Sequence, residues 1–233
     1  IPDSKTVWNF RQQLVDFELV DPIFSLFIKE LEKLGLIVNE GKIIDASFVE
    51  VPKQRNTKDE NKQIKNGEIP KSFEDNSNKK EQKDTDARWT QKNNVNYFGY
   101  KNHIKIDSKS KIITKYEVTS ANVHDSQVID NLLNEKDKGE EFYADSAYTG
   151  EKQVEVIDQK GMINCVHEKG YKGRPLTDEQ KLSNTEKSRT RARVEHIFGF
   201  METNMNQMYL QYIGFKRINA SIGLMNLTYN MFR

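Results

Sequence analysis

Apolar residues near the start of the chain recur with the spacing of amphipathic helices. The first stripe consists of Val7, Phe10, Leu14 and Phe17. A second stripe follows Asp21-Pro22 and closes at Gly35. Steps of three and four residues predict helices, so residues 4–37 should form a small helical hairpin packed on the main body. A DNA-contacting helix pair is the alternative, supported only by Lys5, Arg11, Lys29 and Lys33.

The rest of the chain alternates between strand and helix patterns. Residues 43–49, Ile-Ile-Asp-Ala-Ser-Phe-Val, predict a buried strand with one carboxylate in its middle. Further strands are predicted over 97–106, 112–119, 141–144 and 162–166. Helices are predicted over 123–133 (starting at Asp125 or Ser126), 151–159, about 186–209, and from about 217 to the C-terminus. This order predicts an α/β fold, a mixed sheet flanked by helices.

The composition changes sharply between residues 53 and 85. This segment holds nine Lys or Arg, seven Asp or Glu, and only three sizeable apolar residues. It buries too little apolar surface to offset the entropy of ordering, so we predict a mobile, disordered-type insertion at about 53–85. We therefore divide the chain into an N-terminal helical segment, 1–38, and a main domain, 39–233. Because the chain starts at Ile1, we expect the first segment to be truncated.

Overall composition narrows the class of protein. The 36 basic and 35 acidic residues give a formal net charge of +1, so any nucleic-acid site must come from a local cluster. No apolar run approaches the roughly 20 residues of a membrane span, and we expect no membrane association. A single cysteine, Cys165, excludes an intrachain disulfide and suits a reducing cytoplasm. One cysteine and four scattered histidines leave no zinc-site spacing.

Three acidic side chains stand out by their context. Asp45 interrupts an apolar strand, Asp145 ends the strand over 141–144, and Glu195 lies in the long helix at the margin of its apolar stripe. The predicted topology could bring all three to one end of the sheet. Hard oxygen ligands suit Mg²⁺ or Mn²⁺, and a pair of such ions supports phosphodiester chemistry. The alternatives are a structural or capping role for each aspartate and a plain i, i+4 ion pair between Arg191 and Glu195.

Basic residues cluster close to the proposed acidic site. Between residues 168 and 193 they outnumber acidic residues by eight to four. Such a cluster would neutralise backbone phosphates without reading bases. The candidate DNA-binding residues are Lys169, Lys172, Arg174, Lys187, Arg189, Arg191 and Arg193. A solvated helix start with ordinary charges is the alternative.

Six motifs, in order along nearly the whole chain, carry a resemblance to a known family. They are Ile-Ile-Asp-Ala-Ser (43–47), Asp-Ala-Arg-Trp (86–89), Phe-Gly-Tyr-Lys-Asn-His (98–103), Ala-Asn-Val-His-Asp (121–125), Tyr-Ala-Asp-Ser-Ala-Tyr (143–148) and Arg-Ala-Arg-Val-Glu-His-Ile-Phe-Gly (191–199). Together they resemble transposases of bacterial insertion sequences, specifically the IS-five-like branch of the DDE superfamily. The resemblance implies an RNase H-like catalytic domain whose acidic triad is Asp45, Asp145 and Glu195.

The same resemblance implies the chemistry and the partners. We expect two divalent ions, Mg²⁺ or Mn²⁺, and strand cleavage and joining at transposon ends. The expected partners are transposon-end and target DNA, bound by a homodimer or higher oligomer in the cytoplasm, at the nucleoid. The family's signature places a Tyr and a Lys where this chain has Ser188 and Glu202, so end recognition should differ in detail. The alternatives are a catalytically inactive DNA-binding protein derived from a transposase and a metal-dependent nuclease without joining activity.

Overall fold

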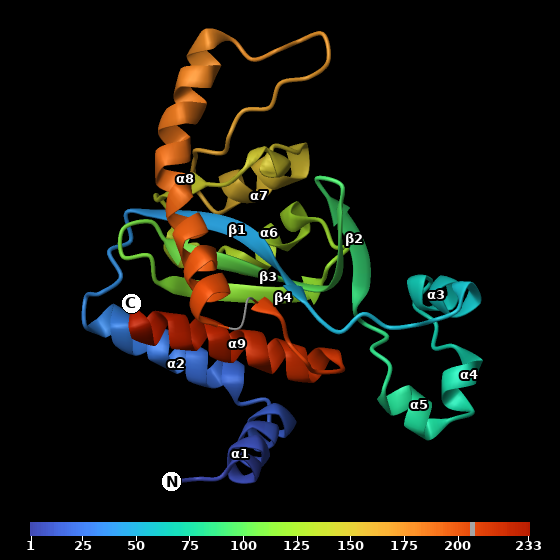
Figure 1. The fold of residues 1–233 in the computed structure, drawn as a ribbon. Helices are drawn as coiled ribbons and strands as arrows, with labels where there is room; N and C mark the ends of the chain where they lie inside the picture. The colour runs from blue at the N-terminus through green and yellow to red at the C-terminus, as the bar shows by residue number, and fades with distance from the viewer. Residues whose placement is uncertain (206–207) are drawn as a thin grey trace.

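The chain folds around one mixed β-sheet with helices on both of its faces (Figure 1). The computed structural model describes residues 1–205 and 208–233. Strand β1 (Gly41–Glu50) lies inside the sheet, with an antiparallel neighbour on one side and a parallel neighbour on the other. Because the strand lies inside the sheet, helices cover both of its faces. This accounts for its run of apolar residues.

The strand order is consistent with an RNase H-like fold. β1 pairs antiparallel with β3 (Val95–Asp107), and β3 pairs antiparallel with β4 (Ile113–Ser120). On its other side β1 pairs parallel with β5 (Glu141–Tyr143), which pairs parallel with β6 (Ile163–Asn164). The prediction of a mixed α/β sheet flanked by helices is therefore confirmed.

Two apolar clusters hold the helices against the sheet. Ile43 and Ile44 are both fully buried, and because successive side chains of a strand alternate in direction they join different clusters. The cluster around Ile43 includes residues of three helices: α2 (Val20–Lys33), α8 (Asp178–Asn204) and α9 (Phe215–Phe232). The cluster around Ile44 includes residues of α6 (Ile129–Leu132) and α7 (Glu151–Gln159). Asp45, two residues after Ile43, thus belongs to the face covered by α8.

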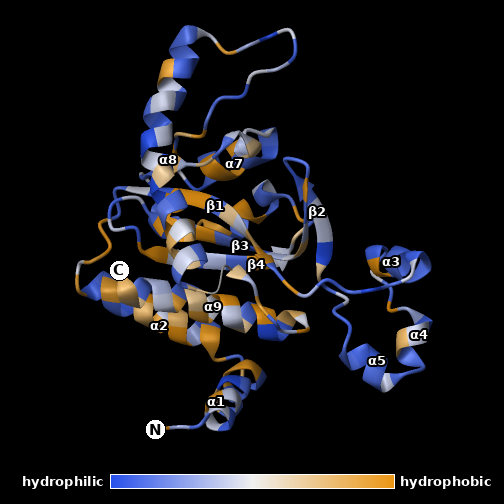
Figure 2. Ribbon diagram, viewed as in Figure 1, coloured by the Kyte–Doolittle hydropathy of each residue, from blue (hydrophilic) through white to orange (hydrophobic). Residues whose placement is uncertain are grey.

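The two predicted N-terminal helices are present as α1 (Ser4–Asp16) and α2. Asp3 caps α1 by accepting a hydrogen bond from the Thr6 amide, and Phe24 of α2 packs edge-on against Tyr116 of β4. Figure 2 shows apolar residues along the neighbouring α2 and α9, whereas the first half of α8 is mostly hydrophilic. No helix among the described residues combines the length and apolar character of a membrane span.

The long helix α8 differs from its prediction at both ends. It begins at Asp178 rather than at about residue 186, because Thr177 and Gln180 form a capping box at its start. It ends at Asn204, and Tyr209 instead forms a β-bridge with Glu50, so the predicted end at 209 is wrong. Residues 206 and 207, which the predicted helix included, lie outside the described residues.

Several other elements were not predicted or differ from their predictions. Strand β2 (Arg88–Lys92) pairs with the beginning of β3, where the sequence indicates only a return of order. The helix predicted over 123–133 is a 3-10 turn, Asp125–Val128, followed by α6, and it is capped by His124 rather than by Asp125 or Ser126. The segment 53–85 contains three short helices: α3 (Lys58–Lys65), α4 (Lys71–Glu74) and α5 (Ser77–Glu81). Its mobility stays a prediction.

Candidate active site

Asp45 lies in the middle of β1 on the face that α8 covers. Its side chain is 19% exposed, so most of it is removed from water. One carboxylate oxygen, Oδ1, accepts a hydrogen bond from the Ala46 amide at 2.8 Å, and the other, Oδ2, faces Arg191 of α8 at 3.1 Å. A mostly buried carboxylate therefore has one oxygen fixed by the backbone and one directed to a cation.

Asp145 is placed beside Asp45 by the parallel pairing of β1 and β5. The register pairs Ile43 with Tyr143, so each aspartate follows that pair by two residues, Asp45 within β1 and Asp145 just beyond the end of β5. Neighbouring strands lie about 4.8 Å apart. Asp145 also caps the short 3-10 helix Ser146–Tyr148, where its Oδ1 accepts a hydrogen bond from the Ala147 amide at 2.8 Å. Asp145 therefore does have the capping role that the sequence left open. Its other carboxylate oxygen, Oδ2, remains for other partners.

Glu195 approaches Asp45 through a shared arginine. Arg191 Nη1 lies 3.1 Å from Asp45 Oδ2, and Arg191 Nη2 lies 2.9 Å from Glu195 Oε1. The i, i+4 ion pair between Arg191 and Glu195 is therefore present, but the same guanidinium also joins the helix to the strand. Glu195 is the most open of this group, with a side chain that is 57% exposed.

The electrostatics of the site follow from this crowding of acids. Burial raises the pKa of Asp45 to about 6, against the lowering effects of the Ala46 amide and Arg191 and with a further rise caused by Asp145. The rise that Asp145 causes is the effect expected of a second negative charge near a carboxylate. The positive charge of Arg191 lowers the pKa of Asp45 and so favours the ionised carboxylate.

Tyr148 and Asp125, which lie in two 3-10 turns that contact each other, were not among the predicted site residues. Tyr148 is 1% exposed, and its hydroxyl has no hydrogen-bond partner within residues 1–205 and 208–233. Burial raises its pKa far above the ordinary range, and the negative charges of Asp125, Asp45 and Asp145 raise it further. Asp125 is itself paired with Lys101 at 2.7 Å. Both residues lie in motifs quoted above, which was the available signal.

The donor set suits a divalent ion, although it is not gathered around one point. No three His, Cys, Asp or Glu side chains of the described residues converge into a group that could hold a metal. Asp45 and Glu195 nevertheless bracket a positive group, and Asp145 adds a third carboxylate next to Asp45. Carboxylate oxygens are the ligands that Mg²⁺ and Mn²⁺ prefer. The chemical types of the donors therefore suit such an ion, and the position between Asp45 and Glu195 is held by Arg191.

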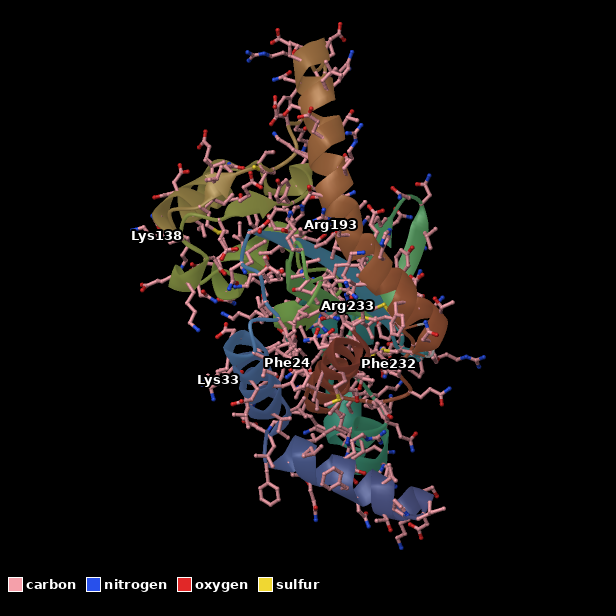
Figure 3. All side chains as sticks on the ribbon, turned by 90° about the vertical axis from the view of Figure 1, so that its left-hand side faces the viewer. Phe24, Lys33, Lys138, Arg193, Phe232 and Arg233 are labelled. Atoms are coloured by element: carbon pink, nitrogen blue, oxygen red, sulfur yellow. The ribbon has the colours of Figure 1, made fainter. Side chains whose placement is uncertain are left out.

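The predicted DNA-binding residues divide into an open group and a group with contacts inside the protein. Lys169, Lys172, Arg174 and Arg189 are exposed. Lys187 donates a hydrogen bond to the Val166 carbonyl at 3.1 Å, and Arg193 donates one to the Ser108 carbonyl at 2.7 Å. Figure 3 shows Arg193 beside the body of the molecule, below the projecting first half of α8. Arg191 lies between the two groups, on the acids.

Comparison with known protein families identifies the class of protein. The family model described as the transposase DDE domain matches residues 38–231, which is most of the chain. The chain belongs to the DDE transposase family. It is thus a transposase-type nuclease whose partner is DNA, in a family whose domains generally use divalent metals. No solved structure matches this DDE transposase domain closely.

Proposed function

We propose that this DDE transposase belongs to the IS-five-like branch and cuts DNA at transposon ends before joining them to target DNA. The observation that carries the proposal is the placement of Asp45 within β1 and of Asp145 just beyond the end of the neighbouring β5, with Glu195 linked to Asp45 through Arg191. The proposed site lies at the carboxyl end of β5, the end of an α/β sheet at which ligand sites usually collect.

Asp45, Asp145 and Glu195 are the residues that would hold two Mg²⁺ or Mn²⁺ ions. Bound there, the ions supply activation of the attacking oxygen and stabilisation of the leaving oxygen of a phosphodiester. Asp45 contributes through Oδ2, because its Oδ1 is occupied by the Ala46 amide. Asp145 keeps one oxygen free of the Ala147 amide that its other oxygen binds.

The reaction consists of two successive displacements at phosphorus. In the first, water attacks the phosphodiester at the transposon end, and the bond to the 3′-oxygen breaks to release a 3′-hydroxyl. In the second, that 3′-hydroxyl attacks a phosphodiester of the target DNA and displaces a 3′-oxygen there. Lys169, Lys172, Arg174, Lys187, Arg189, Arg191 and Arg193 would hold the backbone phosphates of these strands.

The assembly follows from the reaction. Two transposon ends and one target must be handled together, so we propose a homodimer or higher oligomer on DNA, acting in the cytoplasm at the nucleoid. The positions of Ser188 and Glu202 affect only the recognition of the end: Ser188 lies 3.1 Å from His167 Nε2, and Glu202 is exposed.

The test is a product assay with the full-length protein. Labelled DNA from the ends of the encoding element is incubated with the protein and Mg²⁺ or Mn²⁺, and the products are separated by size. We expect both a cut strand and a joined product, and neither with Asp45→Asn. Cleavage without joining would instead identify a metal-dependent nuclease. Binding with neither product would identify an inactive DNA-binding protein derived from a transposase.

A further inference from the structure

Arg191 occupies the position between two of the proposed ion ligands. Its guanidinium reaches Asp45 Oδ2 on β1 and Glu195 Oε1 on α8, at 3.1 and 2.9 Å. The side chain is 23% exposed, so it lies at the boundary between the site and the solvent. It is therefore the one described residue that binds both a strand acid and the helix acid of the proposed triad.

The guanidinium is held by charge and is not built into a complete hydrogen-bond network. Its Nε is buried and has no hydrogen-bond partner among the described residues. Buried donors of permanent structural arginines are normally all bonded, because an unmet donor costs free energy. One positive charge also balances the three acids only in part. These two features indicate a cation that can be replaced.

We propose that Arg191 is an exchange residue: it neutralises Asp45 and Glu195 in the free protein and turns to a DNA phosphate when a divalent ion is bound by those acids. The proposal rests on the proposed function, since it takes both acids as ion ligands. A guanidinium released in this way suits a phosphate, whose oxygens it can bind with two parallel hydrogen bonds. Divalent-ion binding and DNA binding should therefore strengthen each other, and by the same factor.

The first measurement is the affinity of the full chain for Mn²⁺ alone. It is obtained by titrating the protein with Mn²⁺ in the absence of DNA. Arg191→Gln removes the competing charge, so its dissociation constant for Mn²⁺ should fall on the order of tenfold relative to wild type. Arg189→Gln is the matched control, because it removes the same charge from the same helix but touches neither acid. Its Mn²⁺ affinity should stay at the wild-type value.

The second measurement is the salt dependence of binding to a short fluorescent DNA duplex, with and without Mn²⁺. In the wild type, Mn²⁺ should steepen the log–log slope by about one unit relative to its effect on Arg191→Gln, because one more phosphate contact forms. Mn²⁺ also competes with the protein for DNA phosphates. Comparing wild type and Arg191→Gln at the same Mn²⁺ concentration cancels this effect. Circular dichroism establishes that each variant is folded. If Arg191→Gln is not, Arg191→Lys replaces it, with tighter Mn²⁺ binding again expected because an ammonium cannot span both acids.

Four results would overturn the proposal. Weaker Mn²⁺ binding by Arg191→Gln would show that Arg191 organises the acids instead of competing for them. Equal changes of salt slope in wild type and variant would show that Arg191 stays on the acids when DNA binds. Absence of Mn²⁺ binding by every form, with no cleavage product, would remove the proposed function together with the exchange. Normal cleavage with no difference in Mn²⁺ affinity would remove the exchange alone.

Discussion

The two halves of helix α8 differ in what surrounds them. The half that follows Arg191 holds all of the buried residues of the helix, Val194, Ile197 and Met201, and packs on the sheet. The half before Arg191 has no buried residue, and its side chains project from the body of the molecule (Figure 3). The packed half of the helix thus holds Glu195 in place. The unpacked half leaves its basic side chains open to solvent. Arg191 stands at the junction.

The largest effect should come from the acid in the packed half. Glu195→Gln keeps the size of the side chain but removes the charge that would bind an ion, so cleavage of labelled end DNA should fall by orders of magnitude. DNA affinity should stay similar or rise, because a repulsive charge near the phosphates is lost. The same substitution in the projecting half, Glu186→Gln, should leave cleavage within a few-fold of wild type. Full cleavage by Glu195→Gln would reduce Glu195 to the ion-pair partner of Arg191.

Substitutions in the two halves should also differ in their effect on the free energy of unfolding, because only one half is packed. Ile197 is fully buried, so Ile197→Ala should lower the free energy of unfolding by about 2–5 kcal/mol. Leu182 in the projecting half is 69% exposed, and Leu182→Ala should change it by no more than about 0.5 kcal/mol. Urea unfolding followed by circular dichroism measures both. A large loss for Leu182→Ala would mean that the projecting half is covered in solution.

The raised pKa of Asp45 gives stability a specific dependence on pH. Since burial raises this pKa from 3.8 to about 6, the folded chain binds more protons than the unfolded chain between these values. The stabilising contribution of the neutral acid is complete below pH 3.8 and is lost as the pH rises through about 6. Relative to Asp45→Asn, the wild type should lose roughly 3 kcal/mol between pH 4 and 7. Urea unfolding with a chelator present measures this, and parallel pH curves would contradict it.

The sequence predicted the acids and the fold class because both depend on local pattern. An aspartate inside an apolar strand and an aspartate at a strand end are visible as Asp45 and Asp145, and the alternation of elements indicates the mixed sheet. The beginning of α8 was missed because residues 178–185 are polar apart from Leu182 and have no apolar period, although the capping box of Thr177 and Gln180 was readable.

The link between the acids could not be predicted from the sequence. The spacing of Arg191 and Glu195 indicates an i, i+4 pair, and that pair is present. The contact of Arg191 with Asp45 depends instead on how α8 is turned over β1, which is set by the packing of Ile197 and Met201 in the cluster around Ile43. The same limit applies to Tyr148, because the burial of its hydroxyl depends on the packing of the cluster around Ile44.

The smallest effects should distinguish two arginines on either side of the junction. Arg189 is exposed in the projecting half, so Arg189→Ala should weaken DNA binding and lower the log–log salt slope by up to about one unit, without loss of stability. Arg193 donates to the Ser108 carbonyl, so Arg193→Ala should instead cost about 1 kcal/mol of unfolding free energy and change the slope less. Fluorescence anisotropy at several salt concentrations and urea unfolding measure the two quantities. An equal fall in slope for Arg193→Ala would mean that this side chain leaves Ser108 for a phosphate, and that the DNA-binding surface continues into the packed half of the helix.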